Sequence, residues 1–265
     1  MLTLRFVLAG IRARRLHHEC GPAQNEIEYH LAESSKNADD AVLGMWITRL
    51  LASEFGWKAL FNPKPFEQEA GSGLHQHMYL FRLSDKKNAF REEGKTNVLN
   101  AVGRNFSCGM VKYAKDITAI FAHDPETFRR LRPGYEAPVY AGWDYQNRTA
   151  LVRVPHISIG GEEKTRVEFR AGDATGSIHL LCAALLAAGV RGIEEKLDMP
   201  NAPLNFEHAT PEEQARYKIE LLPTSMEQCL KILHESAFCA DLLGADAVRK
   251  LVELRQPGGH HHGEH

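Results

Sequence analysis

Two histidines, His75 and His77, follow a glycine-rich turn with one residue between them. In an extended strand, neighbouring side chains alternate between the two faces, so both imidazoles point the same way. The glycines of the turn, Gly71 and Gly73, allow a backbone to approach a ligand closely. A pair of this kind lies in a core or on a surface more often than at a metal, so the spacing alone is weak evidence for a site.

Four other strand-like stretches also carry ionisable side chains on one face, and they strengthen the case. The five groups are Glu19, Glu26 with Glu28, His75 with His77, Arg148 with Arg153, and Glu168 with Arg170. Crowded carboxylates repel one another unless a cation binds, and Mg²⁺ and Mn²⁺ prefer oxygen ligands with an occasional imidazole. Arginines beside such a site indicate a phosphate or carboxylate substrate. Together these residues predict phosphoryl transfer aided by divalent ions.

Several neighbouring side chains have a purely structural interpretation. Glu28 and His30 are typical of a solvated strand face, and His17 and His18 are expected to be structural rather than ligands. The sequence contains neither the Walker glycine loop nor the dinucleotide-binding fingerprint. A nucleotide that binds here is therefore expected to do so without those two devices.

Hydrophobic periodicity predicts the elements that position these residues. Helical spacing indicates helices over 3–9, 38–55, 97–122 with a break near Gly109, 178–196, 225–243 and 245–254. Alternation indicates strands over 11–18, 26–31, 57–62, 75–83, 149–157 and 165–170. Prolines and a glycine indicate a loop over 128–140. The expected fold class is α+β, with a curved, mostly antiparallel, open barrel-like sheet, a polar inside and helices on the outer face.

The composition of the 265-residue chain limits its class. With 43% hydrophobic and 25% charged residues, it is predicted to form one globular domain over residues 1–255 and a disordered His-rich tail over 256–265. The formal net charge of −2 argues against nucleic-acid binding, and no apolar run approaches a membrane span. Five scattered cysteines without a Cys-x-x-Cys pair fit reduced thiols, so a cytoplasmic location is expected.

Several separate motifs in the same order resemble the catalytic domain of the glutamine synthetase family. The family patterns HHE with Q.E, PKP, GSG.H.H, PGYEAP, NR with R.P, and R.E.R are matched within residues 17–26, 62–66, 70–77, 130–138, 147–155 and 166–170. The resemblance covers residues 10–254. It implies ATP-dependent ligation of ammonia to the γ-carboxylate of glutamate through γ-glutamyl phosphate, with Mg²⁺ or Mn²⁺ as the metal cofactor.

The resemblance assigns metal and nucleotide contacts to particular residues. Glu19 and Glu26 match ligands of one divalent ion, which lies near glutamate and the transferred phosphate. His75 and Glu168 match ligands of a second ion, which lies on the ATP phosphates. Contacts to the nucleotide phosphates are matched by two further side chains, His77 and Arg153.

The resemblance also implies positions that bind and transform the substrates. Gly71 and Arg130 match positions that hold glutamate. Glu136 matches a loop residue that closes the site and helps to bind ammonium. Arg148 and Arg170 match groups that stabilise the transferred phosphoryl group and the glutamate. Because the family assembles in rings with sites between neighbours, a homo-oligomer is expected.

The sequence departs from the family in ways that leave the activity open. The family's N-terminal β-grasp domain, and a strand with two further metal-binding carboxylates, have no match in these 265 residues. Each ion is therefore expected to lack one carboxylate ligand. Two alternatives follow: a ligase that uses another amine, such as a polyamine, or a non-catalytic protein that keeps the fold.

Overall fold

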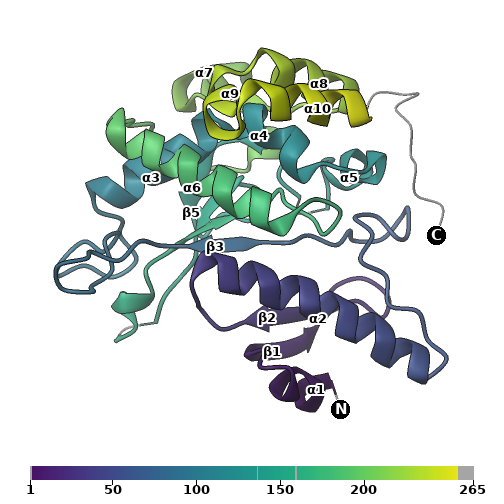
Figure 1. Ribbon diagram of the computed structural model, residues 1–265. Coiled ribbons are helices and arrows are strands. Elements are labelled where there is room, and N and C mark those ends of the chain that lie inside the picture. The colour runs from purple at the N-terminus through teal and green to yellow at the C-terminus, as the bar shows by residue number, and fades with distance from the viewer. Residues whose placement is uncertain (1, 136, 159, 256–265) are drawn as a thin grey trace.

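The computed structural model describes residues 2–135, 137–158 and 160–255, and it has the mixed α+β fold that the sequence predicts (Figure 1). Its helices are α1 Leu2–Leu8, α2 Ser34–Glu54, α3 Ala101–Lys112, α4 Ala114–Phe121, α5 Pro125–Arg130, α6 Ile178–Glu194, α7 Pro211–Tyr217, α8 Met226–Glu235, α9 Ala237–Leu243 and α10 Ala245–Arg255. Its strands are β1 Ala13–His18, β2 Asn25–Tyr29, β3 Gln76–Met78, β4 Tyr140–Ala141, β5 Trp143–Tyr145, β6 Val152–Val154, β7 Val167–Phe169 and β8 Glu220–Leu221. The predicted tail at 256–265 lies outside the described residues.

Among the described residues, the strands form three separate sheets rather than one curved sheet. One sheet has the order β3-β7-β6-β5, while β1 pairs with β2 and β4 pairs with β8. Every pair is antiparallel except β5 with β6. The expected barrel-like curvature is not supported, because none of these described sheets closes and β3 and β5 each have one partner strand.

Several predicted strands are shorter in the structure or absent, because a strand requires a hydrogen-bonded partner. Of the predicted strands 149–157 and 165–170, only Val152–Val154 and Val167–Phe169 are strands. Residues 57–62 form no strand, and Trp57 there is 76% exposed. The predicted strand 75–83 is shorter, since β3 covers only Gln76–Met78. Beyond it the chain turns back on itself, with the amide of Ala89 donating to the carbonyl of Leu80 at 2.7 Å. Alternation of apolar and polar residues in the sequence does not reveal where a partner strand is missing.

Glycine at position 109 serves helix packing and does not break a helix. The predicted helix over 97–122 divides at Tyr113, between α3 and α4. A Cβ at Gly109 would lie 2.1 Å from the carbonyl oxygen of Ala188 and 2.8 Å from Cα of Gly192, which brings α3 and α6 into backbone contact. The helix predicted over 225–243 likewise divides at Ser236, whose hydroxyl caps α9 by accepting from the amide of Cys239 at 3.1 Å.

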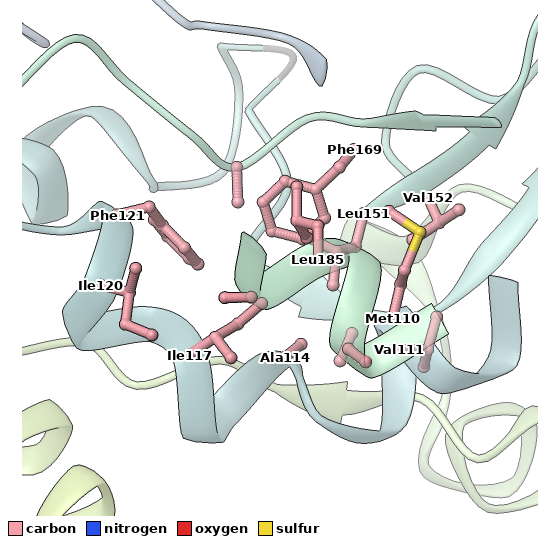
Figure 2. Packing of buried hydrophobic residues seen from close by; sticks show 14 of the residues in the cluster. Met110, Val111, Ala114, Ile117, Ile120, Phe121, Leu151, Val152, Phe169 and Leu185 are labelled. Carbon is pink, nitrogen blue, oxygen red and sulfur yellow. The ribbon is translucent and has the colours of Figure 1, made fainter. Parts of the chain in front are cut away.

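The core lies between the helices α3, α4 and α6 and one face of the four-stranded sheet (Figure 2). Phe169 of β7 packs edge-on against Phe121 of α4, with ring centroids 5.5 Å apart. Val167 and Phe169 are both fully buried. Because side chains alternate along a strand, Glu168 between them points to the opposite face. The apolar packing of β7 therefore fixes where that carboxylate lies.

A second layer, made of α2 and the β1–β2 hairpin, lies below the four-stranded sheet in Figure 1. α2 packs on α6 through a small cluster of Ala38 and Ala41 with Ile178 and Cys182. Tyr29 of β2 lies against Gly44 of α2, where a Cβ would meet the tyrosine hydroxyl at 2.3 Å. This contact requires glycine and holds the hairpin close to α2. No helix in the described part of the chain is long and apolar enough to cross a membrane.

The helix α10 is tied to α4 by a half-buried arginine. Arg255 donates to the carbonyl of Ala119 and to Nε2 of His123. Burial, with the positive charge of Arg255, lowers the pKa of His123 to about 4. The imidazole is therefore neutral in the folded protein over most of the acidic range.

We expect stability to fall as the pH drops from about 6.5 to about 4, because the unfolded chain binds a proton at His123 that the folded chain excludes. His123→Gln removes this proton, so its free energy of unfolding should depend less steeply on pH in that window, by up to about 1.4 kcal/mol per pH unit. Urea unfolding at half-unit pH steps measures the slope. An unchanged slope in the variant would contradict the prediction.

Candidate functional site

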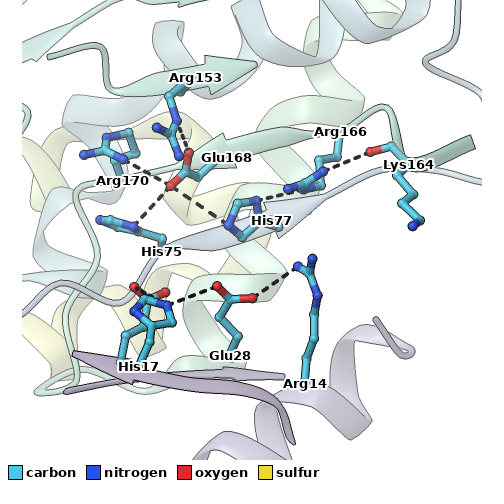
Figure 3. A network of polar contacts seen from close by, with 11 residues as sticks. Arg14, His17, Glu28, His75, His77, Arg153, Lys164, Arg166, Glu168 and Arg170 are labelled. Carbon is cyan, nitrogen blue, oxygen red and sulfur yellow. Dashed lines mark hydrogen bonds and ion pairs between the residues drawn. The ribbon is translucent and has the colours of Figure 1, made fainter. Parts of the chain in front are cut away.

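A row of charged side chains crosses the polar face of the four-stranded sheet. Strand register places His77 of β3 opposite Glu168 of β7, and Glu168 opposite Arg153 of β6. Directly opposed residues share a face of the sheet, so the three side chains form one row. His75, just before β3, and Arg170, just after β7, lie at the same place (Figure 3). Each of the five ionisable groups singled out in the sequence supplies at least one residue to one of two clusters, an upper one on this sheet and a lower one on the β1–β2 hairpin.

Glu168 is the centre of the upper cluster and is only 1% exposed. Its Oε1 lies 3.1 Å from Nδ1 of His75 and 3.1 Å from Nη1 of Arg170, and its Oε2 accepts from Nε of Arg153. Burial alone would favour the protonated acid. The hydrogen bond from His75 and the neighbouring positive charges outweigh burial and hold the pKa of Glu168 well below its usual range.

The pKa values of the two imidazoles in this cluster are lowered, which favours their neutral form. Burial is the largest cause that lowers the pKa of His75, and it lowers the pKa of His77 to about 4. Nε of Arg166 donates to Nδ1 of His77 at 3.1 Å, which requires that nitrogen to be unprotonated. When Nδ1–H of His75 faces Glu168, its Nε2 lone pair is available to a ligand. Neutral imidazole is the form that binds metals.

The lower cluster lies on the β1–β2 hairpin. Oε1 of Glu19 lies 3.6 Å from Nδ1 of His17, and Oε2 of Glu26 lies 3.7 Å from Nε2. One ligand atom from each of these three residues falls within 4.8 Å of the others. Burial, the hydrogen bond with Glu19 and the negative charge of Glu19 raise the pKa of Glu26 to about 7. The two carboxylates are therefore crowded together, as the sequence predicts.

Both clusters face the same space between the hairpin and the sheet (Figure 3). Side chains of His17 and Glu28 rise from the hairpin toward His75 and His77 in this view. The hairpin is anchored by Gln24, whose Nε2 donates to the carbonyl of Gly71 at 2.9 Å and to the hydroxyl of Ser72 at 3.2 Å. Glu19, Glu26, His75 and Glu168 are thus gathered by two elements that one glutamine joins.

Gly71 and Arg130, which the resemblance pairs as glutamate contacts, lie against each other. A Cβ at Gly71 would meet Cγ of Arg130 and the carbonyl oxygen of Pro63, both at 2.6 Å. The guanidinium of Arg130 donates to the carbonyls of Ala171 and Gly172 and is only 3% exposed. Among the described residues, its Nε has no hydrogen-bond partner. Burial lowers the pKa of Arg130 to about 10, so it stays charged at neutral pH.

Two predicted site residues remain, Arg148 and Glu136. Arg148 lies on an exposed turn after β5. Glu136 lies outside the described residues. Two residues were not selected from the sequence: His17, which was expected to be structural, and Gln24. The one signal for His17 in the sequence is its position two residues before Glu19. Strand register then places it opposite Glu26.

We expect Glu168→Gln to lower the free energy of unfolding by about 3 kcal/mol or more, because Arg153 and the buried Arg170 would both lose the charge of the carboxylate that they share. The matched control is Glu163→Gln, which breaks a pair with Arg91 in which the glutamate side chain is 59% exposed. That change should cost less than about 1 kcal/mol. Urea unfolding compares the two, and equal losses would count against the buried cluster.

We expect Gly71→Ala to cost about 1–3 kcal/mol, because the new methyl group would overlap a backbone carbonyl and the stem of Arg130. The matched control is Gly73→Ala, whose Cβ would meet the ends of His75 and Arg130 at 3.1 and 3.2 Å. These contacts are about half an ångström longer than those at Gly71, so a shift of a few tenths of an ångström relieves them and the loss should be smaller. Urea unfolding of both variants gives the comparison, and a larger loss for Gly73→Ala would refute it.

Comparison with known proteins gives one consistent result. Residues 2–258 match the family model described as the glutamine synthetase catalytic domain. A glutamine synthetase of Thermotoga maritima is 37% identical over 249 residues, covering 93% of this chain and 55% of the relative. Glutamine synthetases of Mycobacterium tuberculosis and Pyrococcus furiosus are each 36% identical, covering 89% and 93% of the chain. The chain spans about half the length of the curated relatives it matches.

Proposed function

Since this chain belongs to the glutamine synthetase family, we propose that it forms the catalytic half of an ATP-dependent ligase that joins ammonia to the γ-carboxylate of glutamate. The observation that carries the proposal is the pair of facing clusters. One holds two crowded carboxylates, and the other holds a buried carboxylate among arginines and neutral imidazoles. A reaction between two anions, a carboxylate and a nucleotide phosphate, needs positive charge around the reacting groups, which arginines and cations held by such carboxylates would supply.

Divalent ions fit the donor atoms of both clusters. Glu19 and Glu26 are the proposed ligands of one ion, because two like charges so close together are stabilised by a cation. His75 and Glu168 are the proposed ligands of a second ion, with a neutral imidazole 3.1 Å from a carboxylate oxygen. When bound, Mg²⁺ or Mn²⁺ supplies charge neutralisation on the phosphate oxygens.

Glutamate is proposed to bind at Gly71 and Arg130. The absence of a side chain at Gly71 lets the stem of Arg130 pack directly against its backbone, and the guanidinium of Arg130 supplies a fixed positive charge. Because Arg130 is buried and held by two carbonyls, it loses little conformational freedom when a carboxylate binds. Its role is to orient the substrate rather than to transfer a proton.

The nucleotide and the transferred phosphoryl group are assigned to the upper cluster. His77 and Arg153, on either side of Glu168 in the row, are the proposed contacts to the nucleotide phosphates. Arg170 and Arg148 are proposed to stabilise the transferred group, and Glu136 to help bind ammonium. We also propose that the active protein is a homo-oligomer, as in the family that the sequence resembles.

A second function, that of a non-catalytic binding subunit, is favoured by one observation. Glu168 is already paired with two arginines, which satisfies its charge without an ion. Such a protein would bind nucleotide or metal without turnover.

A hydroxamate assay separates the two functions. The purified chain is incubated with ATP, Mn²⁺, glutamate and hydroxylamine, alone and together with the part of the Thermotoga relative that the alignment leaves uncovered. We expect γ-glutamyl hydroxamate in the mixture and a fall of about 100-fold or more for Glu26→Gln, since a lost charge-stabilising group costs that much. The surface variant Glu163→Gln is the control.

The outcomes of this assay are distinct. Product from the chain alone shows that it is an independent enzyme, and product only in the mixture shows a divided one. Absence of product from both, by a chain that circular dichroism shows to be folded, rejects the ligase and leaves the non-catalytic function. Replacing hydroxylamine by a polyamine tests the variant that uses another amine.

A further inference from the structure

The lower cluster contains an imidazole at its centre as well as two carboxylates. His17 lies on β1 directly opposite Glu26 of β2, and Glu19 follows one residue after β1 ends. Its two ring nitrogens lie 3.6 and 3.7 Å from carboxylate oxygens of Glu19 and Glu26. In the described part of the chain, these three residues form the one group of three or more metal-binding side chains that converge.

The spacing of the three ligand atoms suits one ion. They lie within 4.8 Å of one another, while an ion with bonds of about 2.1 Å holds its ligand atoms about 3–4 Å apart. The atoms therefore need to approach by only about an ångström. All three side chains are between 31% and 42% exposed, so they can make that movement and an ion can reach them.

The imidazole is also oriented as metal-binding histidines are. Nε2 of His17 lies 3.2 Å from Oε1 of Glu28, and Nδ1 lies 3.1 Å from the carbonyl of His18. Whichever nitrogen binds an ion, the other has an acceptor that fixes the ring. Glu28 is in turn held by Arg14 at 3.2 Å. A histidine held by a carboxylate in this way is the usual outer arrangement of a metal site.

We propose that His17 is a protein ligand of the ion bound by Glu19 and Glu26, and that it makes this site select a first-row transition ion over Mg²⁺. The inference rests on the proposed function only in taking those two glutamates as metal ligands. Imidazole suits Zn²⁺, Fe²⁺ and their neighbours, and Mn²⁺ accepts an occasional imidazole among oxygen ligands, whereas Mg²⁺ prefers an all-oxygen shell. His17 thereby replaces an oxygen ligand with a nitrogen and changes which ion the hairpin holds.

Direct metal binding tests the proposal without any activity measurement. The full chain is used with its four tail histidines, His260, His261, His262 and His265, replaced by alanine in every sample, since they would bind metal themselves. Mn²⁺ and Mg²⁺ are titrated separately by calorimetry. Pulsed electron paramagnetic resonance of bound Mn²⁺ then detects coordinated imidazole nitrogen.

We expect His17→Gln to weaken Mn²⁺ binding by about 100-fold while weakening Mg²⁺ binding much less, so that the preference for Mn²⁺ falls. The matched control, His18→Gln, changes the neighbouring histidine, whose side chain points to the opposite face of the strand. It should leave both affinities unchanged. Glu28→Gln, which removes the charged partner of the ring, should weaken Mn²⁺ binding by about tenfold. His75→Gln in the same background shows which nitrogen signal belongs to the upper cluster.

Each outcome bears on the proposal. The inference is wrong if the His17→Gln variant binds Mn²⁺ as tightly as the His18→Gln variant does. It is also wrong if the nitrogen signal that persists in the His75→Gln variant persists in the His17→Gln variant as well. If Glu19→Gln and Glu26→Gln weaken binding in that case, the proposed metal centre stands without His17. If the parent chain binds no Mn²⁺, the inference is overturned, and the hydroxamate assay decides the proposed function separately.

Discussion

The ion pairing of Glu168 at the centre of the four-stranded sheet is the interaction on which the site depends. A carboxylate that is 1% exposed is stable only when other charges replace the water it has lost, and Arg153 and Arg170 do so from the neighbouring strand and the strand end. Removing either side would leave an uncompensated charge in the interior. Because Val167 and Phe169 on the same strand are packed into the core, the carboxylate cannot turn away from its partners. Apolar packing on one face thus fixes the chemistry on the other.

In the β1–β2 hairpin, in contrast to the sheet, carboxylates lie next to one another. Glu19 and Glu26 lie together without an arginine between them, and their mutual repulsion is partly relieved by the neighbouring His17. The hairpin stays at the site because Tyr29 packs into the space at Gly44 and because Gln24 bonds to the glycine turn. A surplus of negative charge is therefore held in place by uncharged contacts. This is the arrangement that favours a bound cation over a closed network of ion pairs.

The glycine turn links the two clusters to Arg130. Its backbone accepts the bond from Gln24, and Gly71 leaves no room for a side chain between the carbonyl of Pro63 and the stem of Arg130. The hairpin, the turn and Arg130 consequently form one connected unit. Glutamine synthetases of bacteria and archaea align with the chain over this whole region, yet it spans only about half of their length.

The sequence by itself determined the α+β class, most of the helices and the family, because these depend on local periodicity and on short motifs that survive in order. It also selected Glu19, Glu26, His75 and Glu168, since their spacing within strands is a local property. Tertiary structure alone decided how they are grouped, with three separate sheets in the described residues where one barrel-like sheet was expected. Strand pairing, the helix contact at Gly109 and the place of His17 among the carboxylates depend on residues far apart in the chain. No pattern along the chain records which distant backbone or side chain will lie opposite.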